Sequence, residues 1–285
     1  MLVLVGIIVV FASIVVGFTI AGGNLFLLLQ WAEFLIILGT AIGSLLIMAP
    51  MTLLKKIMKA IPGTMKSHKI TKQDYLEILK SFNDLFLVAQ RDGMLSIEPH
   101  IEKPETSKIL SRNKKFLENK AALNFFCDTM KVLLSGAIPA HELETLIEKE
   151  IETFEMESKP IASTIQKIAD AFPGIGIVAA VLGIIVTMSS ISDGAEAVGH
   201  HVAAALVGTF LGVLLSYGFV NPIATNIEHE HEGEVRYLQT IASCILAYAK
   251  GNPPMITVEV ARRTIFSDER PSFTELESFL RNKSK

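Results

Sequence analysis

Lysine and arginine are confined to two blocks of this chain, and this distribution constrains its fold more than any other feature. Eighteen of the 26 basic residues lie within Lys55–Lys167 and eight within Arg236–Lys285, so residues 1–54 and 168–235 contain none. A water-exposed surface must be covered by charge, yet only 19% of the 285 residues are charged and 50% are hydrophobic. This composition excludes an ordinary soluble globular protein and a disordered chain.

Four apolar runs in the base-free regions are each about long enough to cross a bilayer core. A helix needs roughly 20 residues for this, at a rise of about 1.5 Å per residue. We therefore predict an all-α membrane protein with four transmembrane helices, at about residues 2–20, 32–50, 172–191 and 202–220. A cleaved signal peptide is a poor alternative for the first run, because no basic segment precedes it.

The basic residues also predict the topology. The connections within each pair of spans carry no Lys or Arg, so the positive-inside rule places both basic blocks and both termini in the cytoplasm of a bacterial inner-membrane protein. The predicted organisation is two membrane hairpins separated by a large helical cytoplasmic insertion and followed by a helical cytoplasmic tail. These four parts are residues 1–51, 52–171, 172–221 and 222–285.

Helix signals run through the cytoplasmic segments. Thr71 is a candidate N-cap for a helix with apolar residues at helical spacing, beginning at Tyr75. Pro160 is expected to interrupt the helical pattern ahead of the third span. A further helix is predicted over Pro222–Lys250, ending at Gly251.

Several classes of function are disfavoured by what the sequence lacks. It has none of the common nucleotide-binding, hydrolase or metalloprotease motifs, so we predict no enzymatic activity, no cofactor and no metal site. The net charge of −3 gives no indication of nucleic-acid binding. Cys127 and Cys244 are too far apart in sequence for a CxxC metal site and are expected to be buried thiols in a reducing compartment.

Small residues recur at every fourth position of the predicted fourth span: Ala204, Gly208, Gly212 and Ser216. Such stripes allow membrane helices to pack backbone to backbone, either within one chain or between chains. Gly39 and Gly43 form a second GxxxG pair in the second span. Self-association or a partner helix is therefore expected, and surrounding lipid is the other contact.

The interiors of the predicted spans offer hydroxyl groups but no ionisable side chain. A proton or cation path normally needs an ionisable group near the membrane midplane. Hydroxyls can orient water but do not titrate at physiological pH. If the protein handles ions, we therefore expect the titrating carboxylate to come from another chain.

Two prolines flank the second predicted hairpin. Pro173 is expected to open the third span, where a first-turn proline is tolerated, and Pro222 lies between the fourth span and the tail helix. Each can be a helix cap or kink, or a hinge between a membrane helix and a cytoplasmic one.

The sequence resembles the MotA family of flagellar motor stator subunits over essentially its whole length. The similar segments are Met1–Val10, Ala21–Gly23, Gln30–Glu33, Gly93–Glu98, Phe172–Gly176, Gly208–Gly212, Asn221–Ile223 and Ser267–Phe273. The resemblance implies a pentameric ring around two copies of MotB, whose single transmembrane helix carries the essential aspartate. It also implies that ion flow drives a conformational change by which the ring pushes on the rotor protein FliG.

The resemblance assigns roles to individual residues. Pro173 and Pro222 match the two functional prolines of the family, and Thr209 and Thr187 match hydroxyls that face the ion path. Glu98 matches the acidic residue that engages the rotor.

The rotor-facing arginine departs from the family spacing. The family usually places it three residues before the glycine corresponding to Gly93, where this chain has Gln90. We assign this role to Arg91, two residues before that glycine.

The sequence leaves three alternative functions open. An energiser of the ExbB/TolQ type also pairs with a one-span, carboxylate-bearing partner, but such proteins typically have three spans and an external N-terminus. A self-sufficient channel is disfavoured by the missing intramembrane charge, and a membrane scaffold would carry no ions. The choice between proton and sodium is open, although the long cytoplasmic segments resemble the proton-driven members more.

Overall fold

The protein is described by a computed structural model covering residues 2–65, 69–189 and 191–281. These residues form helices and connecting turns and contain no strand, and four of the helices are long and apolar enough to cross a membrane. The predicted all-α fold with four transmembrane helices is therefore confirmed.

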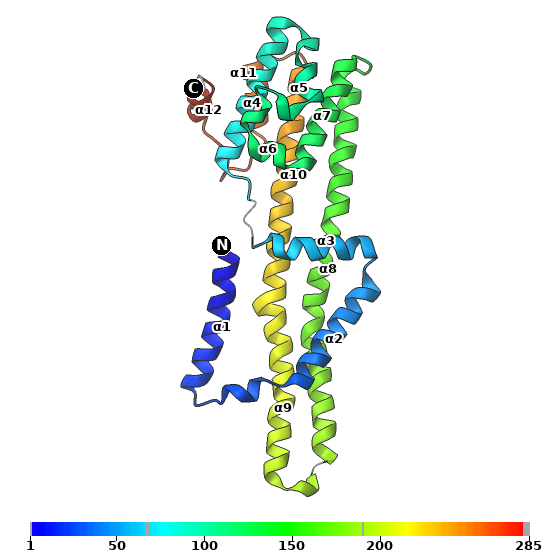
Figure 1. Cartoon of the computed structure of the whole chain (residues 1–285), viewed down its shortest axis with the longest axis vertical. Helices are drawn as coiled ribbons and strands as arrows, with labels where there is room; N and C mark the ends of the chain where they lie inside the picture. The colour runs from blue at the N-terminus through cyan, green and yellow to red at the C-terminus, as the bar shows by residue number, and fades with distance from the viewer. Residues whose placement is uncertain (1, 66–68, 190, 282–285) are drawn as a thin grey trace. The chain divides into compact units, whose positions relative to one another are not determined.

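Two compact units make up the chain (Figure 1). We call one the span unit, formed by the described residues of Met1–His68 and Ser158–Glu230. The other, the polar unit, is formed by those of Lys69–Glu157 and His231–Lys285. Two long helices, α8 (Ala140–Ser189) and α10 (Asn221–Ala249), contribute residues to both.

The remaining elements of the span unit follow the apolar runs of the sequence. They are α1 (Leu2–Ile20), η1 (Leu25–Leu28), α2 (Trp31–Met48), α3 (Met51–Gly63), η5 (Ile191–Asp193), α9 (Ala195–Val213) and the π-helical turn η6 (Leu214–Val220).

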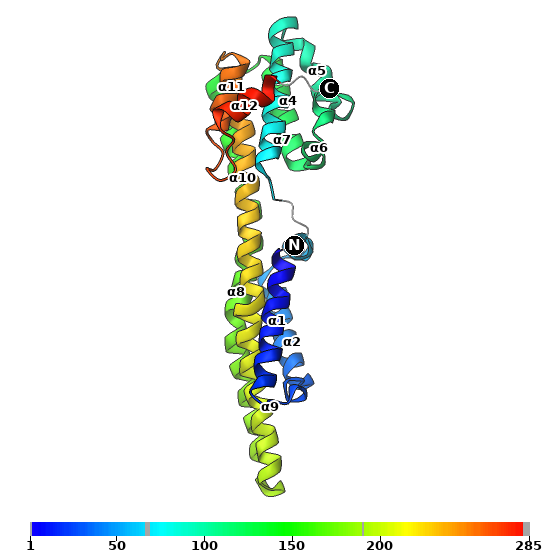
Figure 2. The ribbon, with the colours of Figure 1, turned by 90° about the vertical axis from the view of Figure 1, so that its left-hand side faces the viewer.

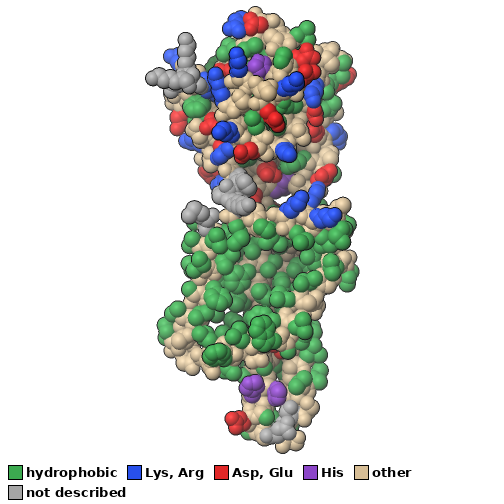
Figure 3. Space-filling view, viewed as in Figure 1, with side chains coloured by type: hydrophobic (Ala, Val, Ile, Leu, Met, Phe, Trp, Pro, Cys, Tyr) green, Lys and Arg blue, Asp and Glu red, His purple; other side chains and the backbone are tan. Residues whose placement is uncertain are grey.

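Apolar side chains cover the outside of the span unit (Figure 3). Helix α1 has no buried residue at all, and large apolar side chains such as Leu35 and Ile185 are exposed. Inside the unit, Ile37 of α2 packs with Ala179 of α8 and Val207 of α9. An apolar exterior around an apolar interior is the arrangement that a lipid surrounding requires.

Helix α3 is an element that the charge pattern did not reveal. Its three lysines suggested ordinary cytoplasmic chain, but Ile57 is buried against Ala162 of α8 and Ala224 of α10, while Met58 is exposed. Figures 1 and 2 show α3 lying across these two helices. A helix with one buried apolar side and a lysine-bearing side is typical of a membrane-surface helix.

Helix α8 corrects two sequence expectations. It runs unbroken for 50 residues, so Pro160 does not interrupt it, and Pro173 lies in its interior rather than in the first turn of a helix. A proline removes one backbone hydrogen bond and crowds the carbonyl four residues earlier. Packing of the helix between the two prolines outweighs this cost, since Ala162, Ile168 and Phe172 are all buried.

The polar unit is a bundle of shorter helices around an aromatic core. Phe82 of α4 (Lys72–Asp92) stacks on Phe126 of α7 (Lys120–Ser135), with ring centroids 4.5 Å apart. Phe116 meets both rings edge-on. The remaining elements are η2 (Met94–Ile97), α5 (Glu98–Glu102), η3 (Pro104–Thr106), η4 (Leu110–Arg112), α6 (Lys114–Glu118), α11 (Pro254–Arg262) and α12 (Phe273–Arg281).

Local sequence signals in this unit agree with the structure. Thr71 caps α4, and Asp74 completes a capping box by accepting from the Thr71 N–H. The long tail helix ends at Ala249, and Gly251 follows with a φ of 85° that favours glycine. Cys127 and Cys244 are free and buried as expected, and burial raises the pKa of the Cys127 thiol to about 11.

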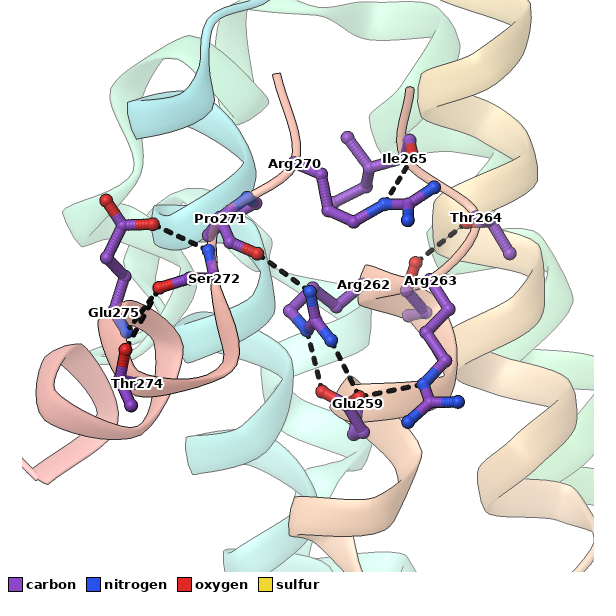
Figure 4. A network of polar contacts seen from close by, with 11 residues as sticks. Glu259, Arg262, Arg263, Thr264, Ile265, Arg270, Pro271, Ser272, Thr274 and Glu275 are labelled. Carbon is purple, nitrogen blue, oxygen red and sulfur yellow. Dashed lines mark hydrogen bonds and ion pairs between the residues drawn. The ribbon is translucent and has the colours of Figure 1, made fainter. Parts of the chain in front are cut away.

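Charged contacts hold the chain between α11 and α12 in place (Figure 4). The Arg262 guanidinium donates twice to the Glu259 carboxylate and once to the Pro271 carbonyl, at 2.7–2.8 Å. Arg270 donates to the Ile265 carbonyl at 2.9 Å. This segment contains the late motif Ser267–Phe273, whose visible role in the structure is to anchor α12.

Candidate functional site

The small-residue stripe of α9 packs against α8 of the same chain at backbone distance. A Cβ added to Gly176 would lie 2.8 Å from the Gly208 carbonyl oxygen, and one added to Gly212 would lie 2.6 Å from the Phe172 carbonyl oxygen. Real side chains do not approach this closely, so Gly176 and Gly212 require glycine. Of the two uses of the stripe left open by the sequence, packing within one chain accounts for Gly208 and Gly212.

The other small residues are placed differently. Ser216 is fully buried, and its hydroxyl has no hydrogen-bond partner among the described residues, whereas Ala204 is half-buried. Gly39 and Gly43 of α2 have open space where a Cβ would be added. This second GxxxG pair therefore contributes no close packing within the described chain.

The two hydroxyls assigned to the ion path lie on the helices that make this contact. Thr187 of α8 is buried, and its hydroxyl donates to the Gly183 carbonyl at 2.8 Å. Thr209 of α9 is half-buried and directly follows Gly208. The structure thus brings both hydroxyls to the α8–α9 pair.

The structure overturns the expectation that the spans hold no ionisable side chain. Glu33, in the first turn of α2, is only 5% exposed. A Cβ added to Gly208 would lie 2.5 Å from its Oε2 atom, and one added to Gly183 would lie 3.5 Å from its Oε1 atom. The Glu33 carboxylate therefore lies inside the helix bundle, between α8 and α9.

Sequence reasoning missed Glu33 because of its position in its own helix. It lies near the start of the second span, where an acidic residue is usually at the membrane surface. Its burial depends on two glycines about 150 and 175 residues away. The available signal was that Glu33 is the only ionisable residue of α2.

The predicted hinge prolines occupy different helical settings. Pro173 is half-buried in the interior of α8. Pro222 is exposed near the start of α10, directly after the π-helical turn, where the Asn221 N–H donates to the Ser216 carbonyl five residues earlier. A π-turn is a wider turn that relieves the crowding a proline causes in the preceding helix.

Arg91 and Glu98 lie on the surface of the polar unit, on either side of the turn that joins α4 to α5. Arg91 donates to the neighbouring Asp92 carboxylate at 2.6 and 2.9 Å, and these bonds lower the pKa of Asp92. Gly93 makes the turn with a φ of 91°, and Glu98 begins α5 with its side chain exposed. Gln90 is also exposed, so position alone does not separate it from Arg91.

Comparisons with known proteins agree over almost the whole chain. Residues 4–93 match the family described as "Motility protein A N-terminal", and residues 117–240 match the "MotA/TolQ/ExbB proton channel family". The fold resembles that of the C. jejuni MotAB structure, with a TM-score of 0.79 over 95% of this chain and 98% of that one at 21% identity. The MotAB stator complex of Bacillus subtilis matches with a TM-score of 0.74 over 90% and 92% at 24% identity.

Curated relatives extend the match in sequence. Motility protein A of Salmonella typhimurium is 37% identical, covering 99% of this chain and 95% of the relative. Motility protein A of Escherichia coli is 36% identical over the same shares, and the chemotaxis protein LafT of Vibrio parahaemolyticus is 34% identical over 96% of each chain. The chain therefore belongs to the motility protein A family, whose members are multi-pass stator subunits of the bacterial flagellar motor.

Proposed function

We propose that this stator subunit forms, with a MotB partner, a channel that converts proton-motive force into torque on the flagellar rotor. The observation that carries the proposal is the full-length similarity to motility protein A, together with four apolar spans in a family of proton channels. The solved structures with this fold are complexes with MotB, which supports the same partner here.

In this proposal the partner's transmembrane helix supplies an ion-binding aspartate beside α8 and α9. Thr187 and Thr209 would line the ion path there. Five copies of the chain would form a ring around two partner helices. Helix α1, which buries none of its residues within the chain, is then available to contact lipid or neighbouring copies.

The polar unit would meet the rotor protein FliG from the cytoplasm, with both termini also cytoplasmic. Its charged surface supports this role (Figure 3), and Arg91 and Glu98 are proposed as the contact residues. One proton crossing about 100 mV supplies roughly 2.3 kcal/mol. Exposed ion pairs of about 0–1 kcal/mol can be broken at each step within that energy, whereas a buried pair could stall the motor.

Pro173 and Pro222 are proposed as the hinges through which ion binding in the spans changes the polar unit. Each removes one backbone hydrogen bond from a helix that contributes residues to both units. We expect Pro222→Ala to assemble normally with the partner but to drive rotation weakly. Wild-type torque from this variant would remove the hinge role.

Complementation tests the function directly. The full-length chain, expressed with its MotB partner in a non-motile bacterium that lacks its own stator, should restore swimming. Speed should fall when a protonophore collapses the proton gradient and should not depend on external sodium. Restored envelope transport without motility would instead support the ExbB/TolQ-type alternative.

Charge reversal tests the rotor contact. We expect Arg91→Glu and Glu98→Lys each to reduce swimming and to be rescued by an opposite reversal on the rotor protein. Lys149→Glu, a reversal at another exposed position of the polar unit, is the matched control and should swim normally. Normal swimming by both test variants would make Arg91 and Glu98 ordinary surface residues.

A further inference from the structure

We infer that Glu33 is a second proton-binding site on the ion path, supplied by this chain itself rather than by its partner. The inference rests on the proposed function, because it adds a protonatable group to the channel assigned there. It begins from the burial of the Glu33 carboxylate between α8 and α9.

The depth of the Glu33 carboxylate within the apolar spans follows from the positions of the two glycines beside it, not from its position in α2. Gly208 lies six residues into the apolar run that begins at Val202, or about 9 Å along the helix at 1.5 Å per residue. Gly183 lies eight residues before Ile191, or about 12 Å. Glu33 therefore reaches well into the apolar part of the third and fourth spans, although it starts the second.

The surroundings of the carboxylate contain no compensating charge. Residues 31–48 of α2, 171–189 of α8 and 202–213 of α9 include no ionisable residue other than Glu33. The nearest ones along α9 are Glu196, His200 and His201, in its first two turns. The Oε2 atom of Glu33 has no hydrogen-bond partner among the described residues.

A lone charge in such a place is costly, so the carboxylate must be neutralised by a bound proton or cation. A carboxylate needs only one oxygen to take a proton. Gly183 and Gly208, which have no side chains, leave space for the Glu33 carboxylate and offer it no positive charge. A carboxylic acid in this site is explained if its function is to bind and release a proton.

The position also suits transfer along the ion path. Thr187 donates to the carbonyl of Gly183, which adjoins the carboxylate, and Thr209 follows Gly208. Both predicted channel hydroxyls are thus within one helical turn of the residues that enclose Glu33. A proton entering the α8–α9 region would bind Glu33 as a carboxylic acid and leave it for the partner's carboxylate, with no change in covalent bonding elsewhere.

Infrared difference spectroscopy of the purified full-length complex with its partner tests proton binding directly. As the pH is lowered, the wild type should show a carbonyl stretch from a newly protonated carboxyl group that is lost in Glu33→Gln and shifted in frequency in Glu33→Asp. Glu196→Gln is the matched control, because it removes an exposed acid from the first turn of another helix of the same unit and should leave the band unchanged.

Rotation of tethered cells gives the functional readout. We expect torque per assembled stator to fall about 10²-fold in Glu33→Gln, the lower end of what a positioned proton-transfer group contributes. Glu33→Asp should retain part of the torque with a displaced dependence on external pH, which a merely structural role would not produce. Glu196→Gln should rotate as the wild type does.

The outcomes separate the inference from the proposed function. A wild-type complex that fails to restore rotation would overturn the proposed function. A wild type that rotates, with Glu33→Gln giving equal torque and an unchanged infrared band, would overturn the inference alone. If Glu33→Gln lowers co-purification with the partner while each assembled complex keeps full torque, Glu33 is a packing residue and the inference also fails.

Discussion

The two units of this chain reach close packing by opposite means. In the polar unit, large rings such as Phe82 and Phe126 fill the core. In the span unit, α8 and α9 approach because Gly176, Gly208 and Gly212 have no side chains to keep them apart. Water drives large apolar groups together, but lipid is as apolar as the groups themselves, so membrane helices depend on close backbone contact.

This comparison predicts that removing atoms harms the polar unit, whereas adding atoms harms the span unit. The largest effect is expected from Phe126→Ala, which empties the centre of the aromatic core. Such a change costs about 3–5 kcal/mol because it leaves a cavity. Hydrogen exchange of the full-length chain should show faster exchange of the α4 and α7 amides.

Leu87→Ala is the matched control for this first prediction. Leu87 is also on α4 but is 47% exposed, so its truncation should leave exchange close to that of the wild type. Unchanged protection in Phe126→Ala would show that the stacked rings do not stabilise the unit.

The second prediction adds a single methyl group to the span unit. Gly212→Ala places a Cβ against the Phe172 carbonyl and Gly176, and overpacking of this kind costs about 1–3 kcal/mol. Heat unfolding of the detergent-purified chain, followed by fluorescence of Trp31 in α2, should shift to lower temperature. Trp31 is the only tryptophan and reports on this unit.

Gly17→Ala controls for the loss of glycine itself. It lies in α1, also a predicted span, with nothing within 4 Å of an added Cβ. Its unfolding temperature should equal or exceed that of the wild type, since alanine favours helix. Equal effects of the two substitutions would mean that close approach of α8 and α9 is unimportant.

The same contrast explains how far the sequence could predict this molecule. The spans and the Thr71 cap were predictable because each depends on neighbouring residues: runs of apolar residues in one case, a short capping motif in the other. The continuity of α8 through Pro160 was not, because tertiary packing overrides the local cost of proline. Glu33 was missed for a related reason: a sequence shows which helix carries a residue but not which distant glycines enclose it.

The third prediction concerns pH and the anchoring of α12. Bonds from Arg262, opposed by burial and aided by Arg263, lower the pKa of Glu259 from 4.5 to about 2. Its stabilising contribution is therefore complete above about pH 4.5 and is lost as the pH falls towards 2. Glu259→Gln should lower the free energy of unfolding at neutral pH by about 1.5 kcal/mol, as expected for charged hydrogen bonds.

Urea unfolding followed by circular dichroism at neutral and acidic pH measures this difference. It should shrink as the pH falls from about 4.5 towards 2, because the Glu259 carboxylate takes up a proton near pH 4.5 in the unfolded chain but only near pH 2 in the folded one. Glu277→Gln removes an exposed acid that pairs with Arg281 and should change stability little at any pH. A Glu259→Gln deficit that stays constant with pH would assign the effect to packing rather than to charge.

The smallest predicted effect tests the helix cap that the sequence alone identified. In the capping box, Thr71 and Asp74 satisfy each other's backbone N–H groups at the start of α4. Burial raises the pKa of Asp74, but hydrogen bonds from Lys115 and Thr71 outweigh it and lower the pKa overall. Thr71→Ala should cost about 1 kcal/mol and accelerate exchange of the first-turn amides of α4 roughly fivefold.

Thr106→Ala, which removes an exposed hydroxyl bonded to the Lys103 carbonyl, is the control and should not accelerate this exchange. Because Phe82 and the other rings hold α4 farther along, the effect should stay within its first turn; faster exchange throughout α4 would mean that the cap, rather than the aromatic core, stabilises this helix.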